Sequence, residues 1–398
     1  MKELQSIIDA SHELERTNTP AALATVVRVT GSAYRRPGAR MLIAANGHTV
    51  GSVSGGCLER DVVNQARRVL QSNEARVVTY DSMSDDDLVW EFNLGCSGIV
   101  DVLIEPFPHH GERDHMTFLA DCLRDRQVGV LATLFAVEGE TRATVGNRVM
   151  LREQHPVRHD IGDGDLAEAI LRDARCALAS GASHTQSYEI GTSRADVFIE
   201  VIQPPVPLVI FGAGHDAVPL VRIAKELGWH VTLVDPRPGY ATRMRFPSAD
   251  TLIVCRPEEV SERVKMDART VATIMTHNML HDSELLKALL PSPLRYLGIL
   301  GPKRRRQRLL GELQENAGSL SDHLLARVYG PVGLDIGADT PEEIALAIVA
   351  EIQAVLSGRL GGFLRNRESA LHEPSHVETV AMRSGTINGV LSCGQEEY

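Results

Sequence analysis

The chain has 398 residues, enough for two or three domains, and 43% of them are hydrophobic, as in an ordinary globular protein. Its formal net charge of −11 argues against broad electrostatic binding to nucleic acid or to an anionic membrane. The sequence opens with no signal-peptide pattern and contains no apolar run long enough to span a bilayer, so we expect a cytoplasmic protein. The six cysteines are sparse and form no C-x-x-C pair, which argues against a disulfide framework or a structural zinc site.

The first half of the chain mixes helical and strand patterns. A helix is expected at 3–16 and a strand at 22–29. The pair Asn46-Gly47 separates two further strands and predicts a hairpin, because both positions tolerate positive φ. Those two strands, and the remaining elements of this half, are expected at 40–44, 48–53, 58–70, 76–80, 99–104, 114–126, 128–137, 143–150, 165–179 and 195–202.

The stretch SVSGGCLE at 52–59 places Cys57 in a glycine-rich turn, with Gly55 and Gly56, directly before a predicted helix. Unpaired backbone N–H groups at a helix start favour negative charge, and therefore a thiolate. Cys57 is thus a candidate for sulfur chemistry or for binding a soft metal. A small cysteine packed in the interior is the alternative, and residue type does not decide between them.

A second cysteine loop follows the strand at 76–80. It contains an acidic run at 81–87, which we interpret as solvated rather than metal-binding, and it reaches Cys96 among small residues. Two cysteines in two glycine-rich loops suit one soft-ligand or sulfur-handling site. Cys122 and Cys176 fall within helical patterns and are interpreted as packing residues.

The segment at 207–235, PLVIFGAGHDAVPLVRIAKELGWHVTLVD, predicts strand, glycine turn, helix and strand. Gly212, Gly214 and Ala217 fit G-x-G-x-x-A, in which the glycines allow a tight turn and the close approach of a pyrophosphate. Asp235 ends the second strand, where an acidic residue usually binds ribose hydroxyls. The proline-rich stretch at 203–207 is the expected linker before this segment.

Later strands, expected at 251–255, 271–275 and 296–300, carry further candidates. His277 follows the second of these strands, at the edge where open α/β sheets place ligands. Lys303 and Arg304 open a helix after the third strand and suit an anion pocket, although a solvated cationic face is the open alternative.

A last glycine-rich loop precedes a helix that Thr340, Pro341 and Glu343 cap. Its glycines suggest a close approach to a ligand. The elements together predict an α/β protein: a mixed α+β N-terminal domain (1–203), a C-terminal Rossmann-like parallel-sheet domain (204–361) and a peripheral tail (362–398).

These segments as a set resemble the XdhC/CoxI family, the xanthine dehydrogenase accessory factors that serve molybdenum hydroxylases. Two positions depart from the usual family pattern: Ser97 replaces a glycine, and Pro302 stands where a serine is usual. The matching segments are Gly31-Ser32 to Gly38-Ala39, SVSGGCLE at 52–59, LGCSG at 94–98, IEP at 104–106, FGAGH at 211–215, VDPRP at 234–238, MTHN at 275–278, LGILGPKRR at 297–305 and GLDIGADTPEEIALAI at 333–348.

The resemblance implies a protein that binds the molybdenum cofactor (molybdopterin) and protects it. It would assist exchange of a terminal oxo ligand for a sulfido ligand and deliver the cofactor to a xanthine-dehydrogenase-like molybdenum hydroxylase apoenzyme. A cysteine desulfurase would supply the sulfur, so the protein would be a chaperone rather than a turnover enzyme. A homodimer is the default expectation for the assembly.

Residue by residue, we expect chemistry at Cys57, Cys96 and His277, with Cys57 also a candidate molybdenum ligand. The expected cofactor-binding residues are Gly55, Gly56, Gly212, Gly214, His215, Asp235, Arg237, Gly301, Lys303, Arg304, Gly333 and Asp335. The competing interpretation is an NAD(P)-dependent Rossmann oxidoreductase with His277 as acid or base. A nucleotide-sensing scaffold without chemistry of its own is a third.

Overall fold

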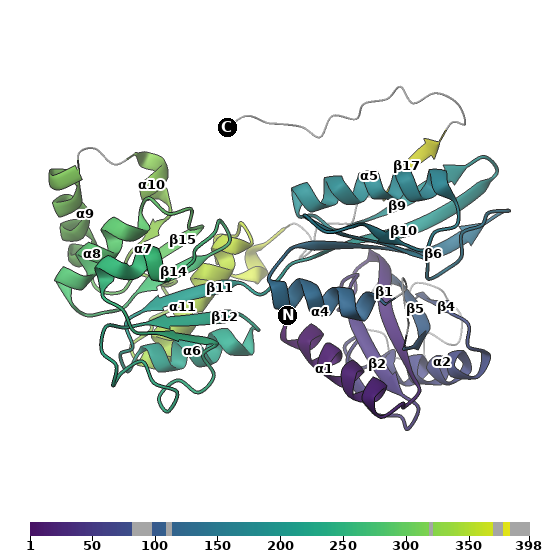
Figure 1. Cartoon of the computed structure of the whole chain (residues 1–398), viewed down its shortest axis with the longest axis horizontal. Helices are drawn as coiled ribbons and strands as arrows, with labels where there is room; N and C mark the ends of the chain where they lie inside the picture. The colour runs from purple at the N-terminus through teal and green to yellow at the C-terminus, as the bar shows by residue number, and fades with distance from the viewer. Residues whose placement is uncertain (82–97, 109–113, 318–320, 369–376, 383–398) are drawn as a thin grey trace. The chain divides into compact units, whose positions relative to one another are not determined.

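The computed structural model describes residues 1–81, 98–108, 114–317, 321–368 and 377–382 (Figure 1). By their internal contacts the residues form two compact units, Glu3–Pro204 with the C-terminal segment from His372, and Pro205–Leu371 with the first two residues. Across the described part of the chain, no helix is long and apolar enough to cross a membrane.

The first sheet of the N-terminal unit is antiparallel, in the order β3-β2-β1-β5-β4. The predicted hairpin at Asn46-Gly47 is confirmed, since Met41 pairs with Gly51 and Gly47 has a φ of +87°. Val62, Ala66 and Val69 of α2 are buried in the core that the helix shares with this sheet. The elements are α1 (Lys2–Arg16), β1 (Ala21–Gly31), β2 (Arg40–Ala44), β3 (Thr49–Gly51), α2 (Glu59–Ser72), β4 (Arg76–Asp81) and β5 (Gly98–Phe107).

The second sheet of this unit has the order β17-β9-β10-β6-β7-β8. Helix α5 covers it, and Ile170, Ala174 and Ala177 are buried in the shared core (Figure 1). The elements are α4 (His115–Asp125), β6 (Gly129–Glu138), β7 (Arg148–Arg152), β8 (Arg158–His159), α5 (Gly164–Ser180), β9 (His184–Ile190), β10 (Ser193–Ile202) and β17 (Val377–Met382).

Four strands of this sheet differ from the sequence prediction, and one of them, the two-residue strand β8, was not expected. The strand expected at 143–150 is β7, at 148–152, because residues up to Asn147 form a turn in which Gly146 has a φ of +91°. Strand β9 was not expected, since its first four residues are polar. Strand β17 pairs in parallel with β9, so the segment expected to be a peripheral tail contributes a strand.

The C-terminal unit is a parallel sheet in the order β13-β12-β11-β14-β15-β16, which confirms the Rossmann-like prediction. The order reverses between β11 and β14. The bounds are β11 (Pro207–Phe211), α6 (Ala217–Glu226), β12 (His230–Val234), β13 (Thr251–Ile253), η2 (Pro257–Glu259), α7 (Val260–Arg263), β14 (Val271–Ile274), α8 (Met279–Leu289), β15 (Tyr296–Ile299), α9 (Lys303–Ala317), α10 (Asp322–Ala326), β16 (Val328–Tyr329), α11 (Pro341–Leu356) and η3 (Leu364–Asn366).

Alternate residues of β11 enter different cores. Leu208 and Ile210 pack with α6 and α11, whereas Val209 and Phe211 pack with α7, α8 and α9. A strand covered on both faces must be apolar throughout, which is why this strand could be recognised in the sequence. The two-sided packing leaves the carboxyl ends of the strands as the edge where loops carry polar groups.

Candidate functional site

The glycine turn after β11 lies where the strand order reverses, the position at which open α/β sheets bind ligands. Gly212 has a φ of +114°, and its N–H donates to the carbonyl of Val234 at 2.8 Å. A side chain on Gly212 would collide with the carbonyl oxygen of Met275, and one on Gly214 with the Oδ1 of Asp216. Only glycine therefore fits at position 212, where the contact is with backbone and φ is positive, whereas the contact at Gly214 is with the end of the Asp216 side chain.

Asp235 closes this turn from the end of β12. Its side chain is 1% exposed, and its Oδ2 accepts from the backbone N–H of Ala213 at 2.7 Å. Arg237 binds both carboxylate oxygens, with Nε 2.9 Å from Oδ1 and Nη2 2.8 Å from Oδ2. Burial opposes ionisation, but the hydrogen bonds from Arg237 and the two backbone N–H groups outweigh it and lower the pKa of Asp235. Ribose binding by Asp235 stays a prediction, and both oxygens already have partners within the fold.

Two guanidinium groups flank Tyr240 beside the glycine turn. The guanidinium carbon of Arg237 lies 3.7 Å from the ring centroid of Tyr240, and that of Arg245 lies 4.8 Å from it. Arg245 also donates to the carbonyl of Ala213 at 2.8 Å. Sequence reasoning named Arg237 and missed Tyr240 and Arg245, which follow it in a loop without a recognisable motif. The group provides positive charge next to the turn and suits an anionic ligand.

His277 and Asp216 meet across the switch point. The Nε2 of His277, in the loop after β14, lies 2.8 Å from the Oδ2 of Asp216, directly before α6. His277 has a φ of +57°, a conformation uncommon for a residue with a side chain, and its side chain is 64% exposed. Such a pair can hold and move a proton at Nε2. Asp216 was not predicted, although it occupies a variable position of the glycine motif.

The basic run that opens α9 divides into two parts. Arg305 turns inward and binds the Oδ2 of buried Asp282 through Nε and Nη2, at 2.8 and 2.6 Å. The other oxygen of Asp282 accepts from the hydroxyl of Thr276, in the loop that carries His277. Lys303 and Arg304 are exposed, so they are the two residues of the run that remain open to an anion.

Three further predicted residues lie in loops of this unit, and a fourth precedes α6. Gly301 follows β15 with a φ of +120°. Gly333, at +110°, donates its N–H to the Oε2 of Glu351 at 3.1 Å, while Asp335 is exposed. His215 is exposed in the glycine turn itself. Their roles in ligand binding stay predictions.

The turn that carries Cys57 is held together by Ser54 and Glu59. The Oγ of Ser54 accepts from the N–H groups of Gly56 and Leu58, both at 3.1 Å, and Glu59 accepts from the N–H of Ser54 at 2.9 Å. Some of the N–H groups expected to be unpaired at this helix start are therefore bonded within the turn. Cys57 itself is partly buried against the core beneath α2, so its side chain is neither fully packed in the interior nor fully exposed.

Tyr34 lies over this turn and was missed by sequence reasoning. A side-chain carbon on Gly55 would stand 3.3 Å from the ring of Tyr34, so glycine is what allows the ring to sit there. The ring is 69% exposed, which is unusual for a large aromatic side chain. Cys57 thus has a flat aromatic surface beside its turn. Cys96 lies outside the described residues.

Cys122 and Cys255 are buried, whereas Cys57 is only partly buried. Burial raises the pKa of Cys122 to about 12, and burial also raises the pKa of Cys255. Where the structure describes the chain, no three His, Cys, Asp or Glu side chains gather in a position that could hold a metal.

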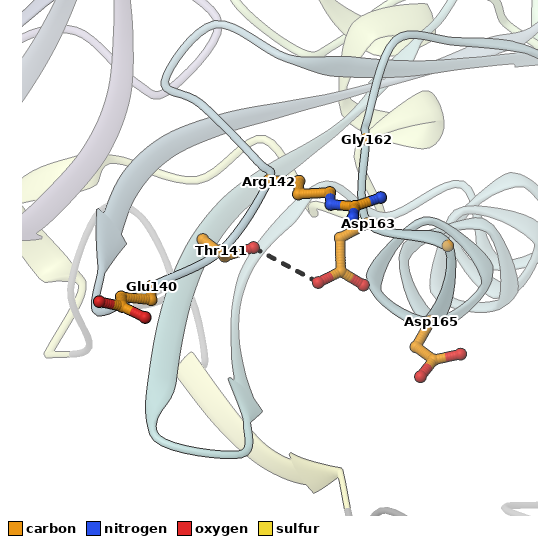
Figure 2. Close-up of a pocket in the computed structure, with 7 residues that line it drawn as sticks. Glu140, Thr141, Arg142, Gly162, Asp163 and Asp165 are labelled. Atoms are coloured by element: carbon orange, nitrogen blue, oxygen red, sulfur yellow. Dashed lines mark hydrogen bonds between the residues drawn. The ribbon is translucent and has the colours of Figure 1, made fainter.

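A cavity of about 580 Å³ opens at the start of α5, away from the predicted residues. Figure 2 shows the carboxylates of Glu140 and Asp165 pointing away from each other. The Oγ1 of Thr141 lies 3.4 Å from the Oδ2 of Asp163, which also caps α5 (Figure 2). The carboxylates do not converge, so this cavity has no metal-binding geometry.

Comparison with known proteins places the chain. A model of the XdhC Rossmann domain matches 208–352, and a model of the XdhC and CoxI family matches both 14–81 and 122–189. A Bacillus subtilis protein named as a probable subunit of xanthine dehydrogenase is 34% identical over 88% of this chain and 97% of its own. The chain belongs to the XdhC and CoxI family.

Two further relatives of this XdhC-family protein have informative names. An Escherichia coli molybdenum cofactor insertion chaperone, PaoD, is 23% identical over 84% of this chain and 83% of its own. A crystal structure described as a xanthine dehydrogenase from Bacillus halodurans superimposes with a TM-score of 0.72, at 32% identity, and covers 91% of this chain and 98% of its own.

Proposed function

We propose that this XdhC-family protein binds the molybdenum cofactor, assists its sulfuration and delivers it to a xanthine-dehydrogenase-like molybdenum hydroxylase. Family membership and the relative named as an insertion chaperone support this class of activity. The sulfur source would be a cysteine desulfurase, and the cofactor is cargo rather than a resident group. The protein acts as a carrier, without a reaction of its own to turn over.

The observation that carries the proposal is the partly buried thiol of Cys57 in a turn fixed by Ser54 and Glu59. Thiolates are soft ligands and suit molybdenum and sulfur. The exposed ring of Tyr34 beside the turn offers a face on which a planar pterin can stack. Because neighbouring side chains hold the turn, the thiol is positioned before cargo arrives.

We infer that the edge of the C-terminal sheet, taken by itself, suits an anion such as a phosphate group. The turn at Gly212 and Gly214 admits a phosphate close to the backbone, and Arg237 and Arg245 place positive charge beside it. Lys303 and Arg304 remain free of the Asp282 network at the start of α9. These groups bind charge and do not select between a bare pterin and its nucleotide forms.

Substitution of Cys57 tests the proposal. Cys57→Ala should abolish activation of the apo-hydroxylase and weaken retention of molybdenum cofactor, measured without oxygen, while leaving the thermal unfolding temperature within a few degrees of wild type. Cys176→Ala, a helix cysteine of the same unit, is the matched control and should behave as wild type in both assays. Wild-type cofactor retention and activation by Cys57→Ala would remove the role assigned to this thiol.

An NAD(P)-dependent oxidoreductase is the second candidate, and two observations favour it: the dinucleotide-type strand order and the His277–Asp216 pair at the switch point. Against it, both oxygens of Asp235 are engaged by Arg237 and backbone N–H groups. Calorimetric titration with NADPH and with molybdenum cofactor distinguishes the two. Tight NADPH binding together with hydride transfer would favour the oxidoreductase.

A further inference from the structure

The two sheets of the N-terminal unit are built alike. Among the residues that the structure describes, each half of the unit runs helix, three strands, helix and two strands along the chain. The first sheet has the order β3-β2-β1-β5-β4, and the corresponding strands of the second have the order β8-β7-β6-β10-β9. The family model also matches this unit twice, in segments of equal length. Such agreement in order, pairing and length indicates a repeated unit.

The register of the strands makes the correspondence residue by residue. Thr25 pairs with Arg40 in the first half, and Thr133 pairs with Arg148 in the second. The same glycines shape both connecting loops: Gly31 and Gly139 have φ of +83° and +84°, and Gly38 and Gly146 have +94° and +91°. Asn73 and Gly181 both end the second helix of their half in the left-handed conformation.

The two halves hold each other through reciprocal ion pairs. Arg40 of the first half binds Glu200 of the second, and Arg148 of the second binds Glu105 of the first. Leu23 pairs with Glu105, and Leu131 pairs with Glu200, so the two glutamates are themselves equivalent. When residue i of one copy contacts residue j of the other, and residue j of the first contacts residue i of the second, the contacts are those of two copies related by a two-fold rotation.

Both arginines also make the same local contact. The Nη1 of Arg40 donates to the carbonyl of Gly38 at 2.9 Å, and that of Arg148 donates to the carbonyl of Gly146 at 2.7 Å. All four charged side chains are largely buried, from 1% to 12% exposed. Each pair therefore ties one loop of its half to a strand of the other half.

The halves diverge where the candidate chemistry lies. By the shared register, the counterpart of Cys57 is Asp165, that of Gly55 is Asp163 and that of Tyr34 is Arg142. These counterparts line the cavity of Figure 2. The turn with Ser54 and Glu59 is thus replaced in the second half by an ordinary helix start, which Asp163 caps.

We propose that residues 2–107 and 115–202 are two copies of one ancestral unit, and that the second copy, which lacks the thiol turn, positions that of the first. The second copy positions the thiol turn of the first through Glu200, and this part of the proposal rests on the proposed role of Cys57. Glu200 neutralises Arg40 and lies against Gly38, where an added side-chain carbon would be 2.6 Å from its Oε1. Glu200 therefore supports the loop from Gly31 to Gly38.

That loop carries Tyr34 onto Gly55 of the thiol turn. Its far side is fixed by Glu3, which binds Arg35 and accepts from the N–H of Ser52 at 3.1 Å. Removing the charge of Glu200 releases one of these two supports. The equivalent change at Glu105 releases the loop at Gly146, which carries no cysteine turn.

The chain thus contains its own control. Glu200→Gln and Glu105→Gln each unbalance one buried ion pair, and both should lower the thermal unfolding temperature by similar amounts. The second measurement is the rate at which iodoacetamide alkylates Cys57 in the native full chain, followed by peptide mass spectrometry. Glu200→Gln should change this rate by about threefold or more, whereas Glu105→Gln should leave it near wild type. Glu200→Asp should restore part of the wild-type rate.

If Cys57 is alkylated at the same rate in Glu200→Gln and Glu105→Gln, whether or not that rate differs from wild type, the positioning role of Glu200 is overturned. If Glu200→Gln fails to fold, Arg40→Lys compared with Arg148→Lys gives the same test with the charge retained. The alkylation rate requires no molybdenum cofactor. A selective effect of Glu200→Gln together with full activity of Cys57→Ala would therefore sink the proposed function and leave the positioning role standing.

Discussion

At the scale of single residues, we expect the thiol of Cys57 to react faster than the thiols of the buried cysteines. Cys57 is partly exposed in a turn, whereas Cys122 and Cys255 are buried and burial raises the pKa of each thiol. The thiolate is the reactive form, so a raised pKa slows alkylation near neutral pH. We expect peptide mass spectrometry after brief iodoacetamide treatment at about pH 7.5 to show Cys57 labelled well before Cys122 and Cys255. Faster labelling of either buried cysteine would contradict this order.

Asp235 makes the stability of the C-terminal unit depend on pH. Its folded pKa is lowered, so the carboxylate stabilises the fold above the unfolded pKa of about 3.9, and this contribution is lost as pH falls through the folded value. Asp235→Asn should cost about 1–3 kcal/mol at pH 7, because Arg237 loses its charged acceptor. Thermal unfolding should show the difference from wild type shrinking below about pH 4.

An exposed aspartate serves as the comparison for that experiment. Asp335→Asn removes a carboxylate from a surface loop and should change stability by less than about 0.5 kcal/mol across the same pH range. A difference between wild type and Asp235→Asn that stays constant with pH would mean that the charge of Asp235 contributes nothing to the fold.

At the scale of elements, a strand could be predicted when its own residues show the pattern that determines it. Strand β11 was predictable because packing on both faces makes it apolar throughout. Strand β9 was not, because it buries Thr185, Gln186 and Ser187. Ser187 finds its partner in Asp196 of β10, at 2.7 Å. Buried polar residues satisfied by a neighbouring strand leave no local hydrophobic pattern to recognise.

The candidate sites, likewise, could be predicted only where a local sequence pattern determines them. Glycine motifs located both turns, since φ values and close backbone contacts are imposed locally. The side chains that complete the turns come from elsewhere: Tyr34 lies over Gly55, and His277 reaches Asp216 across the switch point. Such pairings depend on strand order and loop path, which composition and spacing do not contain.

The repeat in the N-terminal unit was missed for a related reason. Its copies share glycines and the arginines Arg40 and Arg148 where the backbone or a buried charge demands them. The short runs 23–25 and 131–133 are also identical, but several other equivalent positions keep only their apolar character, as with Val62 and Ile170 in the two helices. Register made the equivalence visible because pairing fixes which residues occupy the same place in each sheet.

At the scale of the whole molecule, the hydrophobic cores formed by the described residues do not mix between the two units. Two cores draw their residues from 206–356 alone, and the other four draw theirs from 4–202. A unit with its own cores can fold without the rest of the chain. We therefore expect a fragment of residues 205–371 to be folded, with native-like helical circular dichroism.

The fragment should also unfold in one cooperative thermal transition, as a single domain does. Asp235→Asn placed in the fragment should reproduce the pH-dependent destabilisation seen in the full chain, because Ala213 and Arg237, the hydrogen-bond partners of Asp235, lie within the fragment. A fragment that lacks a cooperative transition would show that the C-terminal sheet requires residues of the N-terminal unit. In that case the two units would depend on each other for stability, although their hydrophobic cores share no residues.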